Sequence, residues 1–250
     1  MTHYLKIILI TGLACYLCAC QFTAKKPLIV LDSGHNPTTS TLGTGAMSVT
    51  GIPEVAYNDR FSGELAKALQ DAGFDVVLTR TPDKEQGLKE RYQIANSFKW
   101  RRSAVFISIH HDSTELQNLK EITVNDTPTY QTIRPIAGTS FHISRENKKY
   151  NKSLTLANHI AKVAKDTGRT LNMQHASENN IKPLELAVND LAIYHHDKLA
   201  VLKNNKLPAL LIEIGVIVDK DDERLVSDDK ERARLVGAIV AGVKGFYELK

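Results

Sequence analysis

The sequence predicts an α/β fold: a single domain with a twisted, mostly parallel sheet and helices on both faces. Several segments are apolar throughout and rich in β-branched residues, as in strands that are buried on both faces. These segments alternate with others whose apolar residues recur at helical spacing. The chain has 250 residues, which leaves enough length after a short leader for one sizeable core.

The first half of the chain holds three expected strands and two expected helices. Apolar runs predict the strands, at Lys26–Leu31, Phe74–Thr79 and Ala104–Ile109. Helical spacing predicts the helices, from Pro53 to Gly73 and over Leu88–Phe98. Proline suits the first turn of a helix and glycine its end, so the first helix has both boundary signals. The glycine-rich segment 38–51 is expected to be a loop.

The second half repeats the alternation with longer connections. Strands are expected at Thr139–Ser144 and Leu207–Val218, and helices at Leu154–Thr167 and Glu231–Tyr247. Thr114–Ile136 is a polar connection with room for a small hairpin. Leu171–Asn205 has no clear periodicity, and we expect one helix within it, at Pro183–Ile193.

The first 20 residues have the pattern of an export signal. Lys6 precedes Ile7–Cys20, which is almost wholly apolar but too short to span a bilayer comfortably. The run ends in Leu17-Cys18-Ala19-Cys20, which resembles the bacterial lipobox. That resemblance implies that 1–20 is a lipoprotein signal peptide, that Cys20 carries the lipid, and that 21–26 is a short tether. An ordinary cleaved signal and an uncleaved anchor are the alternatives.

The cysteine count and the charge fit an exported protein. All three cysteines lie at or before position 20, so the rest of the chain cannot form a disulfide in an oxidising compartment. Gln21 follows Cys20, where an aspartate would favour retention in the inner membrane of a Gram-negative cell. We therefore expect a periplasmic protein held at the outer membrane by its lipid. A net charge of only +4 does not call for a nucleic-acid partner.

Three expected strands end in residues that can perform chemistry. The first runs into Asp32-Ser33-Gly34-His35, the third into His110, and the last strong strand contains Glu213. Ligand sites in open α/β sheets gather outside the carboxyl ends of the strands, so these side chains can meet in space. Glu54 opens the first helix just after the glycine-rich loop, which places it near the same edge.

Two histidines and one carboxylate with an open fourth position form a common catalytic zinc site. A second carboxylate nearby can act as the general base for a water that zinc activates. The chain has no His-Glu-x-x-His motif, no Gly-x-Ser-x-Gly motif and no cysteine after Cys20, so three other hydrolytic routes lack their signatures. From these residues alone, a structural role for the histidines is an equal alternative.

Six motifs in this order make the chain similar to a known family. They are Asp32–His35, Gly51–Asn58, Leu78–Arg80, Arg91 with Ala95-Asn96, Phe106–His110 and Pro208–Gly215. This arrangement resembles the zinc-dependent N-acetylmuramoyl-L-alanine amidases of the amidase-3 type, over nearly all of residues 27–248. The resemblance implies one Zn²⁺ per chain, peptidoglycan as substrate, and a catalytic domain over 27–250. It also implies that His35, Glu54 and His110 are the zinc ligands and that Glu213 is the catalytic base.

The chain departs from the family pattern around these residues. Ser33 stands where the family usually has proline, Asn36-Pro37 replaces glycines, and His111-Asp112 replaces Ala-Asn or Ala-Asp. None of these departures removes a ligand or the base. Thr114–Ile136 and Leu171–His196 are polar, insertion-like segments that have the length to cover the site. Some relatives cover their zinc with a helix and need an activator, so a protein activator is a hypothesis here.

Other polar residues have plainer expected roles. Asp32 either orients His35 or forms the turn after the first strand. Arg80 and Arg91 match family positions, where we expect salt bridges or helix packing. We expect His111 to face away from the ligands. The pair His195-His196 is expected to be exposed, and His142 and His175 have no supporting spacing.

Three other functions compete with amidase activity. The same zinc site would serve a cell-wall peptidase or a deacetylase, which reaction products would distinguish. An inactive binding protein on the amidase fold would have lost a ligand or the base, and all four positions are intact. A structural lipoprotein without zinc is the third alternative, and metal content tests it.

Overall fold

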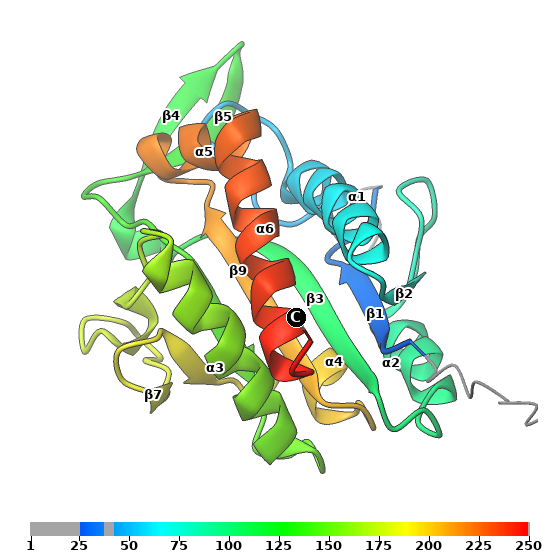
Figure 1. Cartoon of the computed structure of the whole chain (residues 1–250). Helices are drawn as coiled ribbons and strands as arrows, with labels where there is room; N and C mark the ends of the chain where they lie inside the picture. The colour runs from blue at the N-terminus through cyan, green and yellow to red at the C-terminus, as the bar shows by residue number, and fades with distance from the viewer. Residues whose placement is uncertain (1–25, 38–42, 250) are drawn as a thin grey trace, which may run out of the picture.

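The computed structural model describes residues 26–37 and 43–249, so the expected leader with Cys20 lies outside the described residues. Its centre is a seven-stranded sheet with the strand order β2-β1-β3-β9-β6-β8-β7 (Figure 1). The strands are β1 (Leu28–Ser33), β2 (Asp75–Leu78), β3 (Ala104–Asp112), β6 (Ser140–Ile143), β7 (Leu186–Val188), β8 (Ile193–His195) and β9 (Ala209–Val216). Strands β2, β1, β3 and β9 are parallel, whereas β6 runs antiparallel to β9. The predicted mostly parallel sheet is confirmed.

Both faces of the sheet are apolar at its centre, which explains the continuous apolar runs in the sequence. In β1, Ile29 and Leu31 join one buried cluster, while Leu28 and Val30 join another on the opposite face. Alternate residues of a strand point to opposite faces, so a strand that is buried on both sides must be apolar at every position.

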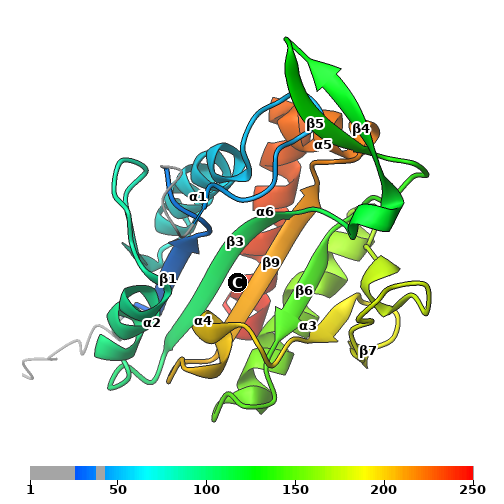
Figure 2. The same cartoon turned by 180° about the vertical axis from the view of Figure 1, so that it is seen from behind.

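The two faces are covered unequally by helices. One face is covered by α1 (Glu54–Asp71), α3 (Tyr150–Asp166), α5 (Lys220–Ser227) and α6 (Asp229–Phe246). Among the α-helices of the described residues, the other face carries α2 (Leu88–Ser97) and the short α4 (Ala200–Lys203). Figure 2 shows that α2 and α4 lie near one end of the strands, and no described helix lies over the carboxyl ends of β1, β3 and β9 on this face.

The polar connection after β3 contains the small hairpin that the sequence left room for. Strands β4 (Leu119–Val124) and β5 (Thr127–Thr132) pair antiparallel across a two-residue turn. Asn125 and Asp126 occupy the left-handed region, with φ of 49° and 62°. Such turns match the twist of the flanking strands and favour these two residue types. The hairpin lies beyond the carboxyl ends of β3 and β9 (Figure 2).

The prediction of a helix at Pro183–Ile193 is wrong. This segment forms β7 and leads into β8, which extend the sheet beyond β6. Leu184, Leu186 and Val188 are apolar at alternate positions, which is the pattern of a strand. The pairing of β7 with β8 favours this pattern over the helical spacing in the same segment. The whole stretch 171–196 contributes one short 3-10 turn and these strands, and no α-helix.

Helix boundaries also differ from expectation. Helix α3 begins at Tyr150, one turn before the expected Leu154. The expected closing helix is preceded by α5, which the sequence analysis did not identify. The carboxylates of Asp219 and Asp228 accept backbone N–H groups at the starts of α5 and α6, so each helix has its own N-cap. In residues 26–37 and 43–249, no helix combines the length and the apolar composition that crossing a membrane requires.

Candidate metal centre and active site

The structure brings His35, Glu54 and His110 together at the carboxyl edge of the sheet. His35 Nε2 lies 3.0 Å from Glu54 Oε2, and His110 Nδ1 lies 3.0 Å from Glu54 Oε1. The three candidate ligand atoms all lie within 4.8 Å of one another. Within the part of the chain that the structure describes, no other group of three or more His, Cys, Asp or Glu side chains meets in this way. The three residues follow β1, begin α1 and lie near the end of β3.

The backbone around these residues is shaped to let them approach. His35 adopts a left-handed φ of 61°, which turns the chain sharply after β1. A Cβ on Gly34 would lie 2.3 Å from His110 Nε2, so only glycine leaves space for that ring. A Cβ on Gly45 would lie 2.3 Å from Glu54 Oε2. Both glycines therefore allow backbone to lie directly against a candidate ligand.

Glu54 is held by several donors besides the two histidines. Its carboxylate accepts the backbone N–H of Ala46 at 3.2 Å and that of His111 at 3.2 Å. It also accepts a hydrogen bond of 3.1 Å from the side-chain amide of Asn58. Burial would raise the pKa of Glu54, but its hydrogen bonds and charge interactions with His110 and His35 outweigh burial and hold the pKa below its usual range. The carboxylate is therefore charged and fixed in orientation.

Asn58 links Glu54 to a histidine on the opposite face of β3. The Oδ1 of Asn58 lies 2.8 Å from His111 Nδ1, which must be the donor because an amide oxygen only accepts. The His111 ring packs near Tyr57 and Phe61, with centroid distances of 5.5 and 6.2 Å. Burial lowers the pKa of His111 to about 3, so the ring is neutral. The prediction that His111 faces away from the ligands is confirmed, whereas the role of Asn58 was missed.

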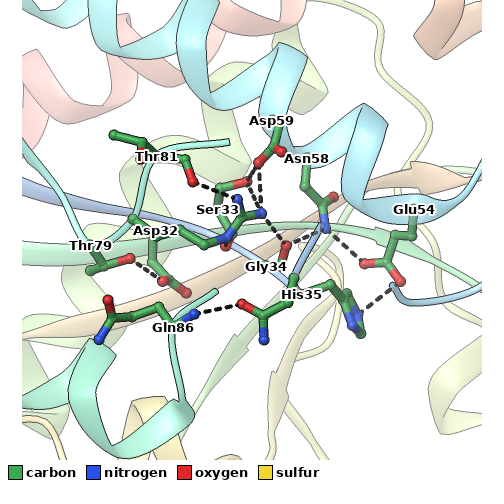
Figure 3. Close-up of polar contacts among 12 residues, drawn as sticks. Asp32, Ser33, Gly34, His35, Glu54, Asn58, Asp59, Thr79, Thr81 and Gln86 are labelled. Carbon is green, nitrogen blue, oxygen red and sulfur yellow. Dashed lines mark hydrogen bonds and ion pairs between the residues drawn. The ribbon is translucent and has the colours of Figure 1, made fainter. Parts of the chain in front are cut away.

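Two buried arginines fix the loop that carries His35. Arg80 forms an ion pair of 2.6 Å with Asp59 and donates to the carbonyl of Gly34 at 3.0 Å. Arg91 donates to the backbone carbonyl of His35 and, at 2.9 Å, to Asn36 Oδ1. Figure 3 shows the polar contacts that converge on this turn. The sequence analysis expected salt bridges or helix packing for both arginines; the structure shows salt bridges, since Arg91 also pairs with Asp32 at 3.2 Å.

Asp32 does not bond to His35 in the structure. Its carboxylate accepts Ser108 Oγ at 2.7 Å and Arg91 Nη1 at 3.2 Å, together with the hydroxyl of Thr79. Of the two roles weighed for Asp32, direct orientation of His35 is therefore not observed. The carboxylate instead ties β1 to β3 and to the arginine that supports the His35 turn.

Glu213 lies beside the three-residue cluster. In the parallel pairing of β3 with β9, Glu213 stands directly opposite His110, so both side chains point to the same face. Its Oε2 atom is buried and has no hydrogen-bond partner among the described residues. Burial raises the pKa of Glu213, and the nearby carboxylates of Asp112 and Glu54 raise it further. An unpartnered carboxylate with a raised pKa, next to a cluster of candidate metal ligands, is suited to proton transfer.

The histidines of the 171–196 stretch make contacts that the sequence analysis did not predict. His175 Nε2 lies 2.7 Å from Asp112 Oδ2, although the sequence offered no spacing that supports a role. The expectation of an exposed pair at His195-His196 is wrong, because both residues are partly buried. His195 Nε2 and the Tyr150 hydroxyl share a hydrogen bond of 2.9 Å. The pairing of β8 with β6 brings His195 and His196 inward.

A cavity of about 190 Å³ opens beside the cluster on the same face. His35, His110 and Asn36 border it on one side, and Leu88 and Leu199 supply part of its apolar wall. The candidate ligands therefore face a space that a substrate group can enter.

Comparison with known proteins agrees with this geometry. Residues 29–245 match the family model described as N-acetylmuramoyl-L-alanine amidase. The "Probable cell wall amidase LytH" of Staphylococcus epidermidis is 26% identical over 223 residues, which cover 89% of this chain and 59% of that protein. The chain thus spans about three fifths of the length of that relative.

Solved structures share the fold. The N-acetylmuramyl-L-alanine amidase Ami1 of Mycobacterium smegmatis superposes with a TM-score of 0.69 at 19% identity, over 90% of this chain and 98% of that one. The CwlD amidase of Clostridioides difficile, solved in complex with the GerS lipoprotein, gives a TM-score of 0.62 at 19% identity, over 89% of this chain and 99% of that one. With a family model that matches most of its length and a sheet that carries the four expected residues at one edge, the chain belongs to the N-acetylmuramoyl-L-alanine amidase family.

Proposed function

We propose that this protein is a peptidoglycan hydrolase that cleaves the amide bond between N-acetylmuramic acid and L-alanine, with one zinc ion held by His35, Glu54 and His110. The observation that carries the proposal is the meeting of these three residues at the carboxyl edge of the sheet, with Glu213 opposite His110 in the neighbouring strand. Membership of the amidase family supports the choice of bond.

The donor set fits zinc. Two imidazole nitrogens and one carboxylate oxygen within 4.8 Å of one another can converge on an ion about 2 Å from each. Three protein ligands leave a fourth position open, as catalytic zinc sites require. Glu54 is charged and held by Asn58 and by two backbone N–H groups, so one ligand is oriented in advance. Zinc at such a site polarises a carbonyl and lowers the pKa of its water to about 7.

The chain's own groups supply the proton transfers. The free Oε2 of Glu213 accepts the proton of the attacking water, and the raised pKa of this carboxyl allows it to hold that proton. Glu213 then returns the proton to the amine of L-alanine as the amide bond breaks. Asp32, Arg80 and Arg91 keep the His35 turn in place during these steps.

A location for the protein can be proposed from the pattern of its first residues. We propose that 1–20 is a lipoprotein signal peptide, that Cys20 carries the lipid, and that 21–26 tethers the catalytic domain of 27–250 to the outer membrane from the periplasmic side. The lipobox-like Leu17–Cys20 supports this proposal. Labelling of the protein with a radioactive fatty acid in cells, lost in Cys20→Ser, tests it directly.

A protein activator stays part of the proposal. The CwlD amidase, which shares this fold, has been solved in complex with a lipoprotein. Residues 171–196 contain no α-helix, so this segment does not supply an α-helix that could cover the ligand cluster.

The experiment that tests the function uses the full chain in detergent and purified peptidoglycan. We expect free stem peptides that begin with L-alanine, and glycan strands without peptides, when the products are analysed by mass spectrometry. A chelator should abolish cleavage and added zinc should restore it. Glu213→Gln keeps the side-chain shape, and we expect it to bind zinc but to lose activity by a factor of about 100 or more.

Other outcomes would identify the competing functions. Cleavage within the stem peptide would indicate a peptidase, and loss of acetyl groups would indicate a deacetylase. One zinc ion bound per chain without any cleavage, even with a cell extract added as a source of activator, would indicate an inactive binding protein. A chain that binds no zinc would refute the metal site itself.

A further inference from the structure

A second cavity lies on the side of Glu213 away from the candidate ligands. The order β9-β6-β8 carries the sheet outward from Glu213, and Ser140 of β6 stands directly opposite it. His142 lies two residues further along β6, on the same face, and pairs with Tyr194 of β8. Neighbouring strands are about 4.8 Å apart, so Tyr194 lies about 10 Å across the sheet from the Glu213 strand.

These strands carry a cluster of rings. The His142 ring lies 5.3 Å from the His175 ring and 5.5 Å from both the Tyr194 and the His196 rings, measured between centroids. His142 is buried, and its Nδ1 has no hydrogen-bond partner among the described residues. Through its hydrogen bond to Asp112, His175 joins this ring cluster to the end of β3, which carries His110.

Beyond the ring cluster, the face opens into a cavity of about 550 Å³ that His175 and His196 line. Two carboxylates that line the cavity already have a cationic partner: Arg145 forms ion pairs of 2.8 Å with both Glu185 and Asp197.

Two further cations line the same cavity, Lys182 and Lys198. Both lysines are exposed residues, and neither forms an ion pair within the described part of the chain. The lining of the cavity therefore contains three permanent cations and two carboxylates. The cavity can accept an anion without breaking an existing ion pair.

The two cavities on this face differ in chemistry. Asp197 and Lys198 border the cationic cavity, while the next two residues, Leu199 and Ala200, border the 190 Å³ cavity beside His35. One short segment thus separates an apolar space from a cationic one, on either side of the catalytic edge. An amide substrate also has two unlike halves: an acyl half, and an amine half that here is a peptide with carboxylates.

We propose that the cationic cavity binds the free α-carboxylate on the second residue of the stem peptide, and that the apolar cavity receives the muramoyl side of the amide. The proposal rests on the proposed function and names the orientation of the substrate in that site. An extended peptide advances about 3.4 Å per residue, so a carboxylate two residues beyond the scissile amide would lie about 7 Å from it, in the direction of the cationic cavity when the peptide runs outward from Glu213 over β6 and β8. Charge-assisted contacts of this kind discriminate a carboxylate from its amide.

The test compares two substrates that differ in one group. Muramoyl-L-Ala-γ-D-Glu-L-Lys carries the free α-carboxylate, and muramoyl-L-Ala-γ-D-isoglutaminyl-L-Lys carries the amide in its place. The double variant Lys182→Gln/Lys198→Gln, made in the full chain, should raise KM for the free acid about tenfold and leave kcat and the amidated substrate nearly unchanged. Lys162→Gln/Lys230→Gln removes the same charge from exposed positions on α3 and α6, and should change neither substrate.

Calorimetry with the released peptides gives a readout that does not need catalysis. L-Ala-γ-D-Glu-L-Lys should bind the wild-type chain more tightly than its amidated form, and the double variant should lose the difference. Equal binding of the two peptides, or an equal loss for both in the double variant, would overturn the proposal. Inorganic phosphate that displaces the peptide at the same concentration would also overturn it, since the cavity would then accept any anion. If the wild-type chain binds the free-acid peptide more tightly but cleaves neither substrate, even with a cell extract added as a source of activator, the proposed function fails and the carboxylate subsite stands.

Discussion

Replacement of Asn58 by leucine tests whether the residues behind the candidate metal centre hold its ligands in position. Asn58 is completely buried, and its amide donates to Glu54 Oε1 at 3.1 Å while its oxygen accepts His111 Nδ1 at 2.8 Å. Leucine has a similar volume and cannot make either contact. The variant therefore removes hydrogen bonds without opening a large cavity.

The expected cost has two parts. A hydrogen bond to a charged carboxylate contributes about 1.5–3 kcal/mol, and a buried N–H without a partner costs about 1–3 kcal/mol. A shift of the His111 proton from Nδ1 to Nε2 would not avoid the cost of the unpartnered N–H, because Nε2 is also buried without a hydrogen-bond partner. We expect the free energy of unfolding to fall by about 3–5 kcal/mol. Because Glu54 loses an orienting donor, zinc affinity should fall about 10- to 100-fold.

Urea denaturation of the metal-free chain measures the first quantity, and competition with a chromophoric chelator measures the second. Asn147→Leu is the matched control. Asn147 is also buried and donates to the carbonyls of Leu202 and Leu207, at 2.9 and 3.1 Å, but it does not contact the ligand cluster. It should lower stability without changing zinc affinity. If Asn58→Leu weakens zinc binding no more than Asn147→Leu does, Asn58 does not orient Glu54 and the reasoning is refuted.

Three further predictions concern the same edge of the sheet. Gly34→Ala should weaken zinc binding about tenfold or more in chelator competition, because its Cβ would lie 2.3 Å from the His110 ring; unchanged affinity would contradict this. Glu213→Gln should make the metal-free chain more stable at pH 7 than wild type, and the difference should shrink as denaturation is repeated toward pH 4. The folded-state pKa of Glu213 is raised by burial and by nearby carboxylates, so its contribution to stability is present below the ordinary glutamate pKa and is lost as pH rises through the raised value. Arg169→Leu should lower the free energy of unfolding by about 3–5 kcal/mol, because it strands the buried Asp222 carboxylate that Arg169 pairs with at 2.7 Å; a loss below 1 kcal/mol in urea denaturation would argue against that pairing.

The central strands and the candidate ligands could be predicted because their signals are local. A strand that is buried on both faces is apolar at every position, as in β1, and this leaves little ambiguity in the sequence. Polar residues that interrupt such runs at the carboxyl end, such as His110, stand out for the same reason. Because these strands are neighbours in the sheet, the polar residues at their carboxyl ends lie close together.

The outer part of the sheet could not be predicted, because tertiary pairing decides it. Pro183–Ile193 satisfies a helical reading and a strand reading about equally, and only pairing with the neighbouring strand resolves the two. The inward positions of His175 and His196 depend on that pairing, so the ring cluster had no signal in the sequence. Asn58 was missed for a related reason: its partners lie 24 or more residues away, except for Glu54 one helical turn before it.

Two of the departures from the family pattern, Ser33 and Asn36, have a common explanation in the structure. Ser33 donates to Asp59 at 2.6 Å, in place of the usual proline. Asn36 accepts the backbone N–H of Gln86 at 2.8 Å, in place of a glycine. Proline stiffens a turn through its fixed φ, whereas these side chains tie the turn to neighbouring segments.

These side-chain hydrogen bonds affect the geometry of the candidate metal centre. The His35 turn is fixed here by Ser33, Asn36 and two buried arginines rather than by the intrinsic stiffness of its backbone. Hydrogen bonds of this kind act together, because loss of one leaves its buried partners without donors or acceptors. Ligand geometry in this chain therefore depends on a polar network that extends from β1 to α1 and α2, so a substitution well away from the ligands can still displace His35.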